Sequence, residues 1–118
     1  MVYLSTSLAL AALEYLVHLD VSTAPSDLVS VELDVPDSVS REHVDLSTLP
    51  DDWDASPDHP ICVDSGDDWI RRAESCLLFV PSGGIPKSWN VLLNPIHPDA
   101  RHIQHRSERF AFDRRLLG

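Results

Sequence analysis

The stretch Leu8-Ala9-Leu10-Ala11-Ala12-Leu13-Glu14-Tyr15-Leu16-Val17 is apolar on every side of a helix, and Glu14 is its one charged side chain. A helix that is apolar around its whole circumference is typical of a largely buried element. A buried carboxylate needs a partner, because desolvating an unpaired charge is costly. We therefore expect Glu14 either to bond a structural partner, such as His18 one turn later, or to face a pocket where it does chemistry.

The remaining sequence alternates between segments with helix or strand patterns and polar loops. Val2 to Leu4 is β-prone, and the hydroxyl side chains after it can cap a helix expected over residues 7–19. The alternation of apolar and polar residues over 28–35 predicts a strand with one solvated face. We expect a second helix over 64–74, short strands at 76–80 and 90–93, and loops at 36–60 and 81–86.

Length and charge place limits on the class of protein. The 118 residues suffice for one domain, spanning 1–118. The net charge is −10, with twelve acidic residues and one basic residue in 1–60, and seven acidic and eight basic residues in 61–118. Such a balance opposes direct nucleic-acid binding and binding to anionic membranes, and it suits a basic protein partner.

The cysteines and apolar runs indicate a compartment. Cys62 and Cys76 have no zinc or redox spacing, so a reducing cytoplasm is the expected location. No apolar run reaches membrane-spanning length, and the first apolar stretch lacks the basic leader of a signal peptide.

Several polar residues admit ordinary structural explanations. Asn90, Asn94 and His97 are expected to hydrogen-bond backbone groups around two prolines rather than to take part in catalysis. The histidines at 97, 102 and 105 have no standard metal-ligand spacing, so no metal site is expected. Ser82, before Gly83-Gly84, is typical of a turn, and neither a phosphate loop nor the elbow of a serine hydrolase surrounds it.

Taken in order, the sequence resembles the RES family of toxin domains. The resemblance covers nearly the whole chain and rests on Val2-Tyr3, the run from Ala11 to Leu19, Leu49-Pro50, Trp53, Gly66 to Trp69, Leu77 to Ser82, Asn90 to Asp99 and Phe112 to Leu116. It implies an α+β (mixed α/β) fold similar to ADP-ribosyltransferase toxins. By position, Glu14 is the family's glutamate, Ser82 its serine and Tyr3 its pocket tyrosine. Without the resemblance, Tyr3 would be taken for a core tyrosine.

The resemblance also implies a reaction and a partner. A RES domain consumes NAD, or transfers its ADP-ribose, and NAD is then a substrate, with no separate cofactor. Loss of nicotinamide passes through a transition state with oxocarbenium character, which a carboxylate such as Glu14 stabilises. Tyr3 would stack on the substrate, and Ser82 would hydrogen-bond a phosphate or ribose oxygen. The implied protein partner is an antitoxin of the Xre-like helix-turn-helix type.

One feature of the family is missing from this chain. The family's arginine precedes its tyrosine, whereas Tyr3 stands almost at the start and the first arginine is Arg41. We therefore expect a RES domain that is incomplete at its N-terminus and lacks an arginine fork for the diphosphate. Three hypotheses follow: a toxin that acts on NAD through Glu14, an inactive domain that retains only antitoxin binding, or a decayed fragment that does not fold alone.

Overall fold

The computed structural model describes residues 1–17, 26–45, 47, 49–54, 60–82, 87–113 and 115. Within these ranges lie two α-helices, α1 (Leu8–Val17) and α2 (Pro60–Arg72), and a 3-10 helix, η3 (Pro98–His102). The strands are β1 (Val2–Ser5), β2 (Val29–Asp34), β3 (Arg41–His43), β4 (Leu77–Pro81), β5 (Trp89–Leu93) and β6 (Gln104–Arg109). The α+β class predicted from the sequence is confirmed.

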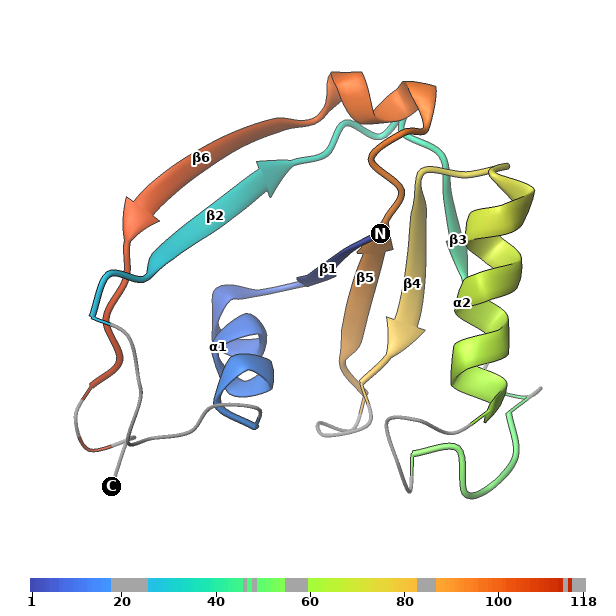
Figure 1. Ribbon diagram of the computed structural model, residues 1–118, viewed down its shortest axis with the longest axis horizontal. Coiled ribbons are helices and arrows are strands. Elements are labelled where there is room, and N and C mark those ends of the chain that lie inside the picture. Colours follow the sequence, from blue (N-terminus) through green and yellow to red (C-terminus); the bar gives the residue numbers. More distant parts are fainter. Residues whose placement is uncertain are drawn as a thin grey trace.

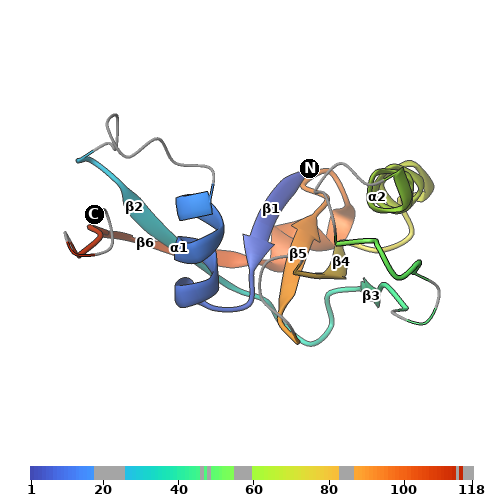
Figure 2. The ribbon, with the colours of Figure 1, turned by 90° about the horizontal axis from the view of Figure 1, so that it is seen from below.

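Four strands form the central sheet in the order β1-β5-β4-β3. The pairs β1–β5 and β5–β4 are antiparallel, and β3–β4 is parallel. The strands β2 and β6 form a separate antiparallel ribbon that arches beside the sheet (Figure 1). Helix α1 lies near β1, and α2 lies near β3 and β4, so the two helices flank opposite ends of the sheet (Figure 2).

Each face of the central sheet carries its own apolar cluster, because successive side chains of a strand point to opposite faces. One cluster contains Leu77 and Leu93 together with Val39, and Leu33 of the ribbon packs against it. On the other face, Trp69 of α2 covers Leu78 and Leu92 and is only 1% exposed. Trp69 therefore attaches helix α2 to this face of the sheet.

Two strands were not predicted from the sequence. The segment 36–60, expected to be loop, contains β3, and the C-terminal segment contains β6. Both strands are polar, and all six residues of β6 are exposed, so neither shows the alternation that indicates a strand. They form because β4 and β2 offer them backbone hydrogen-bonding partners, which is a tertiary effect.

The predicted boundaries of the helices need modest changes, and one prediction about burial is wrong. Helix α2 begins at Pro60 rather than near Asp64, with proline at the first helical position, where its missing N–H costs nothing. Helix α1 is not largely buried: Leu10 is 5% exposed, whereas Leu8 is 56% and Leu13 is 45% exposed. The described part of the chain covers only one side of α1.

Candidate active site

Helix α1 carries Glu14 toward the sheet. Its start is fixed by Ser7, whose hydroxyl accepts a hydrogen bond from Leu10 N across 3.1 Å, as an N-cap residue does. The side chain of Glu14 is half-buried, unlike its neighbours Leu13 and Tyr15, which are exposed. Glu14 therefore lies on the side of α1 that faces the sheet.

Two donors, one directly after β4 and one on β5, meet one carboxylate oxygen of Glu14. Ser82 Oγ donates to Glu14 Oε1 across 2.8 Å, and Asn90 Nδ2 donates to the same oxygen across 3.1 Å. Ser82 directly follows β4 and is 5% exposed, and its backbone N–H donates to Ser88 O across 2.8 Å. Glu14 and Ser82 were expected site residues; Asn90 was not.

A fourth residue extends the hydrogen bonds to the edge of the sheet. Ser5 Oγ donates to Asn90 Oδ1 across 2.8 Å. The two residues are directly opposite one another in the pairing of β1 with β5, so their short side chains reach each other on one face. Ser5, Asn90, Glu14 and Ser82 thus form a continuous chain of hydrogen bonds, which we call the Glu14 relay.

Tyr3 lies apart from this relay. It is opposite Leu92 in the β1–β5 pairing, and its side chain is 77% exposed. Because alternate residues of a strand share a face, Tyr3 projects from the same face as Ser5, two positions away. The expectation of a buried core tyrosine is wrong, and an exposed aromatic ring stands on the relay's side of the sheet.

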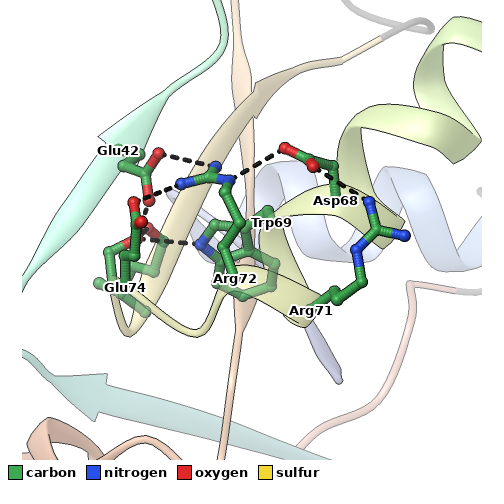
Figure 3. Close-up of polar contacts among 8 residues, drawn as sticks. Glu42, Asp68, Trp69, Arg71, Arg72 and Glu74 are labelled. Carbon is green, nitrogen blue, oxygen red and sulfur yellow. Dashed lines mark hydrogen bonds and ion pairs between the residues drawn. The ribbon is translucent and has the colours of Figure 1, made fainter.

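A second polar cluster joins α2 to β3 (Figure 3). Arg72 forms ion pairs with Glu42 at 3.0 Å, Asp68 at 2.9 Å and Glu74 at 2.8 Å. These carboxylates raise the pKa of Arg72, through hydrogen bonds first to Glu42 and then to the other two. Its guanidinium is consequently engaged in structural contacts and is not a free fork for a phosphate group.

Ser75 completes this second cluster. Its hydroxyl donates to Glu42 Oε2 across 2.5 Å and accepts from Trp69 Nε1 across 2.9 Å. The hydrogen bond from Ser75, and to a smaller extent the neighbouring Arg72, hold the pKa of Glu42 below its usual value of 4.5, against the opposing effect of partial burial. Ser75 therefore connects the core tryptophan to a surface carboxylate.

Two hollows open on the surface away from the relay. One, of about 220 Å³, lies beside the Arg72 cluster and is lined in part by Glu42, Asp68 and Trp69. The other, of about 350 Å³, lies on the β2–β6 ribbon and is lined in part by Glu32 and His105. Neither is lined by Glu14 or Ser82, and residues 83–86, which follow Ser82, are outside the described ranges.

A model of the RES domain family matches residues 1–114. The chain belongs to the RES domain family. This confirms the predicted family and, with the observed sheets and helices, the predicted α+β, ADP-ribosyltransferase-like class.

Proteins similar to this RES domain are named as toxins. A protein of Sphingobium sp. (strain YBL2) named "Prs ADP-ribosylating toxin" is 40% identical over 119 residues, covering 98% of this chain and 74% of the relative. "Toxin Res" of Photorhabdus laumondii is 34% identical, covering 98% of this chain and 75% of the relative. "Toxin Res" of Yersinia enterocolitica is also 34% identical, with coverages of 98% and 76%.

The RES fold brings together two of the three expected site residues. Glu14 and Ser82 are in direct contact, whereas Tyr3 shares only their side of the sheet. The alternative that His18 is the structural partner of Glu14 falls on a residue outside the described ranges. Sequence reasoning missed Ser5 and Asn90, since only the β1–β5 register aligns them.

Of the three polar residues expected to hydrogen-bond backbone groups, two do so and one does not. Asn94 Oδ1 accepts from Ile96 N, and His97 Nδ1 accepts from Asp99 N, so both satisfy backbone groups as predicted. The same prediction for Asn90 is wrong, because its side chain bonds Ser5 and Glu14 instead. The amide of Asn90 reaches α1 through its hydrogen bond to Glu14.

The described residues contain neither a metal-ligand cluster nor a membrane-spanning helix. Within those ranges, no three His, Cys, Asp or Glu side chains gather as they would around a metal ion. Among the helices described, none is long and apolar enough to cross a membrane.

Proposed function

We propose that this RES domain is a toxin domain that breaks the bond between nicotinamide and ribose in NAD, with Glu14 as the catalytic carboxylate. The products would be released ADP-ribose, a phosphorolysis product, or ADP-ribose attached to a protein. The observation that carries the proposal is the position of Glu14: a half-buried carboxylate held through one oxygen by two donors, Ser82 directly after β4 and Asn90 on β5.

The chemistry needs a fixed negative charge near the sugar. As nicotinamide leaves, positive charge develops on the ribose, and a preorganised carboxylate stabilises that charge without reorganising during the reaction. The Oε1 atom of Glu14 is engaged with Ser82 and Asn90, so the Oε2 atom is the one that would approach the substrate. An attacking water, phosphate or side chain would use the same exposed anomeric carbon.

Tyr3 and Ser82 are the proposed substrate contacts. The exposed ring of Tyr3 would stack on the nicotinamide or ribose, a contact that needs an open aromatic face. Ser82 would hydrogen-bond a ribose or phosphate oxygen while it keeps Glu14 in place. The printed name of the Sphingobium relative, an ADP-ribosylating toxin, supports transfer of ADP-ribose as one form of the reaction.

The proposed setting is a toxin–antitoxin system in the cytoplasm. We propose a cognate Xre-like helix-turn-helix antitoxin as the protein partner, and no direct contact with nucleic acid or membrane. The net charge of −10 supports the last point, and the exposed apolar side chains Leu8, Leu13 and Tyr15 of α1 are of the kind that a protein partner buries.

One observation favours a second candidate, an inactive domain that retains only antitoxin binding. The diphosphate of NAD prefers an arginine fork, and Arg72 is saturated by three carboxylates. In this alternative, residues 1–118 form a single RES-like domain that binds NAD weakly.

The test is NAD loss over time with the purified, folded chain, with and without inorganic phosphate, and with a mass readout for modified protein. Loss that requires phosphate identifies phosphorolysis, loss without it identifies hydrolysis, and added mass on a protein identifies transfer. Absence of all three from a chain with a cooperative melting transition would reject the catalytic proposal, and retained antitoxin binding would then establish the alternative.

A further inference from the structure

The proposed reaction leaves two members of the Glu14 relay without a role. Neither Ser5 nor Asn90 is an expected substrate contact, yet their side chains form one half of the relay. We propose that Asn90, oriented by Ser5, is a positioning residue that fixes the carboxylate of Glu14; this inference rests on the proposed function of Glu14.

The chemistry of the amide determines its orientation. The Glu14 carboxylate can only accept hydrogen bonds, so the Asn90 group facing it must be the donating Nδ2. A reversed amide would place Oδ1 against a carboxylate oxygen, two acceptors with no proton between them. With the orientation set by the carboxylate, Ser5 Oγ, at 2.8 Å from Oδ1, donates to the carbonyl end and holds the amide in place.

The backbone under the relay is rigid. Asn90 lies on β5, an interior strand paired on one side with β1 and on the other with β4. In that register it faces Ser5 on β1 and Val80 on β4. Residues held by ladders on both sides shift little, so the amide is a fixed point from which the mobile glutamate side chain can be aligned.

Glu14 needs such alignment. The last torsion of a glutamate is broad, so one hydrogen bond from Ser82 would leave the carboxylate free to rotate about that contact. A second donor on the same oxygen restricts the rotation. Among the described residues none hydrogen-bonds Oε2, so the two donors hold the carboxylate without occupying that oxygen.

The consequence is a loss of rate rather than of substrate binding when the relay is cut. A misplacement of a reacting group by about 1 Å can lower a rate about a hundredfold. We expect Asn90→Ala to lower kcat by about tenfold to a hundredfold and Ser5→Ala by a smaller factor, both with KM for NAD within about twofold of wild type.

Two variants of neighbouring hydroxyls provide controls. Ser5→Thr keeps the hydroxyl that orients the amide and should retain kcat. Thr6, the next residue, donates to the backbone oxygen of Trp89 across 3.2 Å and does not touch the Asn90 side chain. Thr6→Ala removes a hydroxyl from the same link between β1 and β5, so it should leave kcat and KM unchanged.

A Glu14→Gln background separates positioning from stability. If Asn90 acts through the carboxylate, Asn90→Ala should have no further effect on the residual rate of Glu14→Gln. A residue that merely supports the fold would lower that rate again and would lower the melting temperature in both backgrounds. If Asn90→Ala does not fold, Ser5→Ala provides the same comparison from the other end of the relay.

A second readout does not depend on turnover. The NMR order parameters of the Glu14 side chain should fall in Asn90→Ala and Ser5→Ala and remain unchanged in Thr6→Ala. If wild type is active and Asn90→Ala has the same kcat, this inference is wrong and the proposed function stands. Unchanged order parameters in both relay variants would overturn the inference in the same way. Inactive wild type rejects the proposed function, and the order parameters then still determine whether the relay fixes Glu14.

Discussion

Ser82 Oγ and Glu14 Oε1 are 2.8 Å apart, although 68 positions separate the two residues in the sequence. The contact joins the end of β4 to the middle of α1. It brings a hydroxyl and a carboxylate, the two residue types by which the RES resemblance marks these positions, to one point beside β5.

Glu14→Gln should lower kcat for NAD turnover by about 10²–10³ while changing the free energy of unfolding by less than about 1 kcal/mol. Glutamine keeps an oxygen that accepts from Ser82 and Asn90, but it loses the charge that stabilises the ribosyl cation. Steady-state kinetics and urea denaturation measure the two quantities. Glu108→Gln, which removes an exposed carboxylate from β6, is the matched control.

Unchanged turnover in Glu14→Gln would exclude Glu14 from the mechanism. A loss of about 1–3 kcal/mol in unfolding free energy, without a specific loss of kcat, would assign it a structural role instead.

Tyr3→Ala should raise KM for NAD about fivefold, because a lost aromatic contact is worth about 1 kcal/mol. The side chain is 77% exposed, so the unfolding free energy should change by no more than about 0.5 kcal/mol. Tyr3→Phe keeps the ring and should retain the wild-type KM. Equal KM values for all three proteins would show that the ring does not contact the substrate.

Ser75→Ala should lower the unfolding free energy at neutral pH by about 1–3 kcal/mol, because it leaves Trp69 Nε1 without its buried acceptor. It should also weaken the acid dependence of stability. The pKa of Glu42 is lowered in the folded state, chiefly by Ser75. The contribution of this hydrogen bond to the unfolding free energy is therefore present above about pH 4.5 and is lost as the pH falls through the folded-state pKa of Glu42.

The difference between wild type and Ser75→Ala should therefore narrow as the pH is lowered below about 4.5, which urea denaturation at a series of pH values measures. Ser38→Ala, at an exposed loop position, should follow wild type throughout. If the unfolding free energies of wild type and Ser75→Ala run parallel against pH, the Ser75–Glu42 hydrogen bond does not make stability depend on pH.

Cys76 should resist alkylation in the folded protein. Its side chain is 0% exposed, and burial raises the pKa of its thiol, so both access and the thiolate fraction are reduced. In a Cys62→Ser variant, labelling by iodoacetamide should be at least about a hundredfold slower in buffer than in denaturant. Similar rates in the two solvents would mean that the core around Cys76 opens readily.

The amino-acid sequence alone was sufficient for the elements with strong local patterns. The apolar run around Glu14 predicted α1, and the alternation before Pro36 predicted β2. Both predictions were possible because the spacing of apolar side chains along the sequence reflects the helix period of 3.6 residues and the strand period of 2. The order of short motifs predicted the RES family, which is confirmed, and with it the roles that are proposed for Glu14 and Ser82.

Only the tertiary structure determined which strands pair and which side chains hydrogen-bond one another. Strands β3 and β6 are polar and have no pattern of their own, and they exist because neighbouring strands satisfy their backbone groups. Asn90 was expected to hydrogen-bond backbone groups around two prolines, yet the register of β1 with β5 directs its side chain to Ser5 and Glu14. Local sequence sets which conformations a segment favours, whereas contacts between residues 68 to 85 positions apart depend on how the whole chain packs.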